Sequence, residues 1–138
     1  MLPAAKHVLD VYRSEVFGNA PTSALLIDCS TIDVGSARTI EEEAQAKGYE
    51  MVDAPVSGGI AAAAGGTLAF MVGGSNEAFA RAKTIIEPMA KAVIHAGGPG
   101  AGQAAKICNN MILGATMVVT CEAFVMAQKL GLEPQVFF

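Results

Sequence analysis

Two polar side chains, Lys106 and Asn110, stand four residues apart in the segment from residue 97 to residue 110 and are candidates for joint catalysis. Residues with this spacing lie on the same face of a helix, so an ammonium group and a carboxamide are expected to point the same way. Glycines precede them and would let the backbone come close to a ligand. They are Gly97, Gly98, Gly100 and Gly102. The segment predicts a helix face that carries a proton donor or acceptor beside a hydrogen-bonding arm.

A second candidate site follows the strand-like run at residues 49–52 and Pro55. Ser57, Gly58 and Gly59 offer a hydroxyl and two adjacent backbone N–H groups with no Cβ in the way. Such a loop suits a carboxylate or a phosphate. An ordinary tight turn has the same composition, and most helical lysines are simply solvated, so neither segment assigns a function alone.

Together and in this order, the two segments resemble the β-hydroxyacid dehydrogenase family. The resemblance extends over essentially the whole chain: MLP at 1–3, LLIDCSTID at 25–33, DAPVSGG at 53–59, TLAFMVGG at 67–74 and GQAAKICNNM at 102–111. Family members are longer, since they begin with a strand and a GxGxxG loop and end in a bundle of helices. This chain has no GxGxxG that opens a helix, so we expect a fragment without that N-terminal part and without most of the C-terminal helical domain.

The resemblance implies a role for each candidate residue. Lys106 would be catalytic, taking the proton of the substrate hydroxyl while hydride leaves the same carbon for a nicotinamide. The substrate would be bound by Ser57, Gly58, Gly59 and Asn110. The cofactor would be contacted by Leu2, Pro3 and Thr31, of which Thr31 follows a strand where a doubly wound sheet presents its ligand crevice. An alternative for Asn110 is that it links two packed helices.

The activity implied by the resemblance is the NAD-dependent oxidation of 3-hydroxyisobutyrate to methylmalonate semialdehyde, a step of valine breakdown. NADP stays open as the cofactor. One alternative is a tartronate, glyoxylate or succinate semialdehyde reductase of the same family. Another is a non-catalytic truncated fragment that only folds and self-associates. A homo-oligomer is expected, in mitochondria if the source is eukaryotic and in the cytoplasm otherwise.

Composition narrows the classes of partner. The chain has 138 residues, of which 52% are hydrophobic and 16% charged, with a net charge of −4 and no cluster of lysine and arginine. A nucleic acid or an anionic membrane needs a concentrated basic face, so neither is expected as a partner. The three cysteines form no CxxC pair, so we expect no metal site and a reducing compartment. The uncharged run at 111–121 is too short to span a bilayer, which takes about 20 residues.

Short apolar runs at 25–27, 49–53, 67–72 and 93–95 alternate with helical patterns. This order predicts an α/β fold, the C-terminal part of a Rossmann-type doubly wound sheet followed by a long interdomain helix. The expected division is a partial NAD-binding Rossmann domain at 1–98, and at 99–138 the long helix with the start of an all-α C-terminal domain. Because apolar residues lie on nearly all sides of this helix, we expect it to be buried between domains or subunits.

Overall fold

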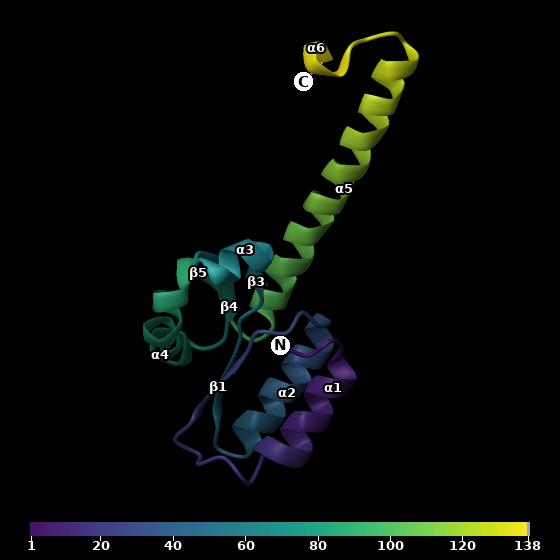
Figure 1. Ribbon diagram of the computed structural model, residues 1–138. Helices are drawn as coiled ribbons and strands as arrows, with labels where there is room; N and C mark the ends of the chain where they lie inside the picture. Colours follow the sequence, from purple (N-terminus) through teal and green to yellow (C-terminus); the bar gives the residue numbers. More distant parts are fainter. Residues whose placement is uncertain (138) are drawn as a thin grey trace. The chain divides into compact units, whose positions relative to one another are not determined.

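The computed structural model describes residues 1–137 and divides into two compact units, Met1–Lys106 and Ile107–Phe138 (Figure 1). The first unit contains α1 (Ala5–Val11), the π-helical turn η1 (Tyr12–Val16), β1 (Leu25–Asp28), α2 (Val34–Ala46), β2 (Glu50–Asp53), β3 (Val56–Ser57), α3 (Gly59–Ala64), β4 (Leu68–Gly73), α4 (Asn76–Ile86), the 3-10 turn η2 (Glu87–Met89) and β5 (Ala90–Gly97). Helix α5 (Ala101–Lys129) begins in the first unit and continues through the second, where α6 (Pro134–Phe137) follows. The predicted α/β fold with a long final helix is confirmed.

The sheet is mixed, whereas the sequence predicted parallel pairing. β1 and β2 are parallel, and so are β4 and β5, but β2 and β3 run antiparallel to β4. They share one edge of β4 in a continuous register, in which Asp53 pairs with Gly73 and Ser57 pairs with Ala69. A parallel return needs a crossover of a dozen or more residues. The connection between β3 and β4 through the six-residue α3 is too short for such a crossover, so β4 pairs antiparallel to β3.

Each face of the sheet has its own hydrophobic core, as a doubly wound arrangement requires. Successive side chains of a strand point to opposite faces, so Leu26 packs with α1 and α2 while Leu25 and Ile27 pack with α4. Figure 1 shows α1 and α2 side by side. The first core contains Val8, Leu26, Ile32, Ala37, Ile40, Ala44, Tyr49 and Met51, and the second contains Val52, Ala54, Phe70, Val72, Ala78, Ala82 and Ile86.

Helices α2 and α4 each begin at a side-chain N-cap. The Asp33 carboxylate accepts a hydrogen bond from Ser36 N at 2.8 Å and begins α2. The Ser75 hydroxyl accepts one from Ala78 N at 3.0 Å and begins α4. Each cap satisfies a backbone N–H group that has no partner inside the helix. The start of both helices is therefore specified locally by the sequence.

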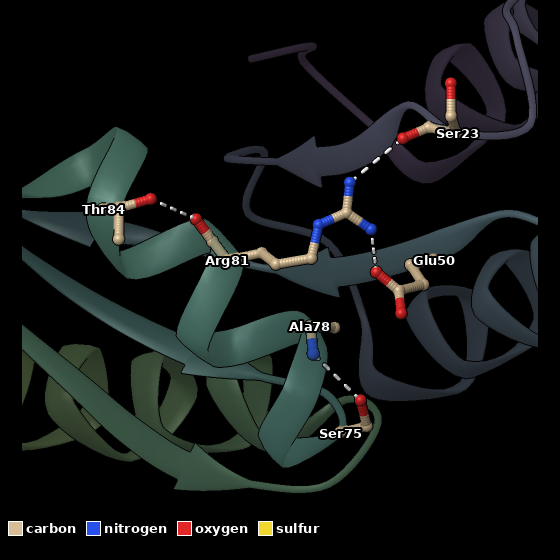
Figure 2. A network of polar contacts seen from close by, with 6 residues as sticks. All are labelled: Ser23, Glu50, Ser75, Ala78, Arg81 and Thr84. Carbon is tan, nitrogen blue, oxygen red and sulfur yellow. Dashed lines mark hydrogen bonds and ion pairs between the residues drawn. The ribbon is translucent and has the colours of Figure 1, made fainter.

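Helix α4 is also tied to the strands by Arg81 (Figure 2). Its guanidinium forms an ion pair with Glu50 at the start of β2 and donates to Ser23 O at 3.0 Å, just before β1. Both partners of the ion pair are about half exposed, so the pair contributes little to stability. It does set how α4 lies over the beginnings of the two strands.

Helix α5 is predicted to be buried between domains or subunits, and this stays a prediction. In the chain by itself, most of the large apolar side chains of α5 from Ile107 onward are exposed, with Met111 at 70% and Val119 at 67% of full exposure. The uncharged run at 111–121 was predicted to be too short to span a bilayer. The whole helix, however, has 29 residues and is long and apolar enough to cross a membrane. The core helix of a soluble protein shares that length and composition, so this property alone does not place α5 in a membrane.

Candidate functional site

The structure brings together two of the predicted site residues from segments far apart in the sequence. Lys106 Nζ lies 2.9 Å from Ser57 Oγ, so the ammonium or amine donates a hydrogen bond to the hydroxyl. Ser57 is not in a loose loop, since it ends β3 and pairs with Ala69 of β4. Lys106 lies in the second turn of α5. A proton-transferring group and a hydroxyl thus share one site that two rigid elements position.

Lys106 reaches Ser57 because the first turn of α5 lies directly on the ends of β2 and β4. A Cβ added to Gly102 would come within 2.4 Å of Met71 O and 2.7 Å of Asp53 O. Glycine is needed here for close approach to the protein's own backbone. Lys106 follows Gly102 by four residues and shares its helix face, so the contact at Gly102 orients Lys106 toward the sheet.

Asp53, the last residue of β2, caps α5 from a distance in the sequence. Its Oδ1 accepts from Gly100 N at 2.9 Å, and its Oδ2 accepts from Gln103 N at 2.7 Å. The side chain is 3% exposed, and burial raises the pKa of the carboxyl group, although the hydrogen bonds from Gln103 and Gly100 oppose that shift. The strand that leads to Ser57 and the helix that carries Lys106 are therefore joined at Asp53. Sequence reasoning treated this residue only as a strand end.

The backbone on either side of the predicted cofactor residue Thr31 is bound by α5. Thr31 is exposed just beyond β1, and Leu2 N donates to the hydroxyl of the neighbouring Ser30 at 2.8 Å. Gln103, which is fully buried, donates to Ser30 O at 2.7 Å and accepts from Ile32 N at 3.1 Å. Sequence reasoning missed Gln103. The feature of the sequence that could have revealed it is a glutamine among small residues, one helical turn before Lys106.

The chemistry of Lys106 depends on its protonation state. Desolvation by the surrounding protein lowers the pKa of the Lys106 ammonium from its ordinary value. A lower pKa enlarges the neutral fraction at a given pH, and only the neutral amine can accept a proton. The environment thus favours a role as general base.

The other predicted substrate residues keep their roles as predictions. Gly58 and Gly59 both have positive φ angles, 130° and 69°, at the start of α3. A Cβ at Gly58 would meet the Cβ of Ala62 at 2.5 Å, so the fold itself requires that glycine, whereas Gly59 faces open space. Asn110 lies further along α5 in the second unit, where its Oδ1 accepts from Asn109 Nδ2 at 3.4 Å.

A separate cavity of about 280 Å³ lies beside α2, lined by Glu41, Gln45, Tyr49, Glu50, Met51, Ser75, Ala78 and Pro99. The Oε2 atom of Glu41 is buried without a hydrogen-bond partner among the described residues. Burial, with a smaller effect of the Asp53 charge, raises the pKa of Glu41 to about 7. The ionised form of this carboxyl group therefore costs folding free energy.

Stability is expected to fall as Glu41 ionises. Since its folded-state pKa of about 7 exceeds the ordinary 4.5, the stabilisation is complete below pH 4.5 and is lost as the pH rises through 7. The shift corresponds to roughly 3 kcal/mol, which solvent screening of this half-buried group reduces to about 1–2 kcal/mol. Glu41→Gln should remove that loss in urea unfolding at pH 5.5 and pH 8, whereas the exposed neighbour variant Glu42→Gln should not. Equal pH dependence in both variants would contradict the assignment.

Comparison with known protein families matches the chain in two segments. Residues 1–98 match the family described as the NAD binding domain of 6-phosphogluconate dehydrogenase. Residues 100–138 match the family described as NAD-binding of NADP-dependent 3-hydroxyisobutyrate dehydrogenase. Because the first match extends over more than half of the chain, the chain belongs to the family of the NAD binding domain of 6-phosphogluconate dehydrogenase.

Particular relatives carry more specific names. The chain is 50% identical to a 3-hydroxyisobutyrate dehydrogenase of Pseudomonas aeruginosa, over 99% of this chain and 46% of the relative. It is 46% identical to an NAD-dependent L-serine dehydrogenase of the same organism, again over 99% of this chain and 46% of the relative. The solved structure of a Mycobacterium tuberculosis 3-hydroxyisobutyrate dehydrogenase with L-serine matches with a TM-score of 0.93 and 49% identity, covering 98% of this chain and 46% of that one. The chain thus spans about half the length of the curated relatives it matches.

Proposed function

We propose that the chain forms the catalytic core of an NAD-dependent dehydrogenase that oxidises 3-hydroxyisobutyrate to methylmalonate semialdehyde, as in valine breakdown. The contact of 2.9 Å between Lys106 Nζ and Ser57 Oγ is the observation that carries the proposal. It joins the segments 53–59 and 102–111, in which the chain resembles β-hydroxyacid dehydrogenases. The lowered pKa of Lys106 gives the site a group able to accept the hydroxyl proton.

The chain's own residues divide the work of this reaction. Ser57, with the N–H groups of Gly58 and Gly59, binds the substrate carboxylate, and Asn110 holds the hydroxyl group. Lys106 Nζ takes the hydroxyl proton as the carbon–oxygen double bond of the aldehyde forms. A bound nicotinamide supplies the acceptor for the hydride that leaves the same carbon. The proton therefore ends on Lys106, and the two electrons leave with the hydride.

The residues near the end of β1 fit a dinucleotide. Thr31 is exposed at the carboxyl end of this strand, and the hydrogen bond from Leu2 N to Ser30 Oγ holds the Leu2-Pro3 segment next to it. Ligands of doubly wound sheets bind at the carboxyl ends of strands, which supports Leu2, Pro3 and Thr31 as cofactor contacts. NAD is proposed because the related serine dehydrogenase is described as NAD-dependent.

The same site chemistry suits L-serine, which shares the three-carbon frame of 3-hydroxyisobutyrate and has an ammonium group in place of the methyl group. Both substrates present a primary hydroxyl and a carboxylate with the same spacing. Ser57 and Lys106 would engage these shared groups alike, so they do not choose between the two. The proposal favours 3-hydroxyisobutyrate because relatives that are 49% and 50% identical to the chain carry that name.

A hybrid enzyme tests the proposal. In it, this chain replaces the matching segment of the 3-hydroxyisobutyrate dehydrogenase of Pseudomonas aeruginosa, whose remaining parts complete the fold. NADH formation should be faster with 3-hydroxyisobutyrate than with L-serine, at equal concentration. A faster reduction of tartronate semialdehyde would move the assignment to the reductases of this family. A folded hybrid without turnover on any of these substrates would refute dehydrogenase activity.

The exposed apolar surface of α5 favours a second candidate function, self-association without catalysis. It includes Met111, Ile112, Met117, Val118 and Val119, each at least 60% exposed. Contiguous exposed apolar surface of this kind marks an interaction site or an aggregation liability. Sedimentation of the 138-residue chain separates the candidates when it is combined with the hybrid assay. Multimers together with an inactive hybrid would favour self-association, whereas turnover by the hybrid supports the enzyme.

A further inference from the structure

Gln103 is a buried polar side chain near the site, and both of its side-chain partners are backbone groups. It is fully buried, and its amide bridges two backbone groups of the segment that follows β1. Its Oε1 accepts from Ile32 N, and its Nε2 donates to Ser30 O. An N–H group can only donate and a carbonyl can only accept, so these partners fix the orientation of the amide.

Through this bridge, the segment that follows β1 and the segment at Leu2 are both joined to the first turn of α5. Ser30 N donates to Asp28 Oδ1 at 2.9 Å, and the Ser30 hydroxyl accepts from Leu2 N at 2.8 Å. The segment that carries Thr31 is therefore tied on one side to Leu2 and on the other to Gln103. Gln103 precedes Lys106 by one helical turn, so the bridge ends next to the lysine on the same helix.

We infer that Gln103 is a positioning residue that sets the separation between the cofactor-contacting segment and Lys106. The inference rests on the proposed function for what binds at Leu2 and Thr31. The proposed substrate-binding residue Ser57 does not depend on the Gln103 bridge, because it is paired with Ala69 in the antiparallel ladder of β3 and β4. Loss of the Gln103 bridge should therefore affect the cofactor far more than the hydroxyacid.

Hydrogen exchange in the 138-residue chain tests the positioning itself. Gln103→Met keeps the length of the side chain but removes both hydrogen bonds, so the Ile32 amide should exchange about fivefold to tenfold faster. The amide of Phe79, which donates to Ser75 O at 2.9 Å in α4, should keep its rate. As a control, Ile86→Ala destabilises the core on the opposite face of the sheet from Ile32. It should not selectively raise the exchange rate of the Ile32 amide. Unchanged exchange at Ile32 would overturn the inference.

Steady-state kinetics of the hybrid enzyme supply the functional readout. Gln103→Met should raise KM for NAD about tenfold, while KM for 3-hydroxyisobutyrate changes less than about twofold. A merely structural role would lower the active fraction and leave KM for NAD unchanged, as Ile86→Ala should do, and this result would overturn the inference. If the unsubstituted hybrid shows no turnover, the proposed function fails. The exchange rate of Ile32 then still decides whether Gln103 positions the segment.

Discussion

Replacing Lys106 with methionine in the hybrid enzyme is expected to reduce kcat by about 100-fold to 10,000-fold, the range by which general acid–base groups contribute to catalysis. Methionine retains an unbranched side chain of similar bulk but cannot take the hydroxyl proton. KM for NAD should stay the same, because Lys106 is not among the proposed cofactor contacts. Lys91→Met, at an exposed lysine in β5, is the matched control and should keep full turnover. Equal turnover of the two variants would refute Lys106 as the base.

The pH dependence of turnover should follow the titration of Lys106. The neutral amine is the active form in oxidation, so kcat should rise with pH as Lys106 loses its proton. Desolvation lowers the pKa of Lys106, and the midpoint should therefore lie below the ordinary lysine value of 10.5. In the reverse direction, aldehyde reduction needs the protonated ammonium and should instead decline as the pH rises. A profile that rises in both directions would contradict this role.

Gly102→Ala is expected to destabilise the chain by roughly 3 kcal/mol, the upper part of the usual range for overpacking a core. The added methyl group would lie 2.4 Å from Met71 O and 2.7 Å from Asp53 O, and backbone atoms cannot move aside as a flexible side chain can. Urea unfolding measures the loss. The first turn of α5 would have to lift from the strands, so the 2.9 Å contact of Lys106 with Ser57 should be lost as well.

Gly114→Ala provides a control within the same helix. A Cβ at Gly114 would meet no atom of residues 1–137 within 4 Å, so the expected effect is the better helix propensity of alanine. This variant should gain about 0.5–1 kcal/mol in stability. A loss of stability in Gly102→Ala together with a gain in Gly114→Ala would show that close packing on the strands makes Gly102 necessary. A similar small change at both positions would contradict that packing.

Much of the fold was readable because local signals specify it. The apolar runs became β1, β2, β4 and β5, and the local caps Asp33 and Ser75 begin α2 and α4. The expected strand at 93–95 extends to Ala90–Gly97, and the segment expected to be a loop contains β3. β3 could not be recognised locally, because its two residues are held by pairing with β4 rather than by their own propensity.

The candidate site was only partly readable for a different reason. The motifs around Ser57 and Lys106 led to a pair that the structure places in contact. Gln103 and Asp53 escaped notice because their partners are backbone groups about 50 to 70 residues away in the sequence. Side-chain patterning cannot reveal a hydrogen bond to a distant carbonyl or N–H group. The apolar surface of α5 was visible in the sequence, but an apolar helix signals that a covering surface is needed and does not identify that surface.

The continuous ladder from β2 through β3 makes the site sensitive to changes in chain length. Asp53 and Ser57 both belong to the edge that pairs with β4, one at the α5 cap and the other beside Lys106. Side chains alternate between the two faces of a strand, so one inserted or deleted residue between them would turn Ser57 to the opposite face. One extra residue between Gln103 and Lys106 would likewise rotate the lysine by about 100° around the helix axis. Evolution or engineering can therefore vary residue types in these segments more freely than their lengths.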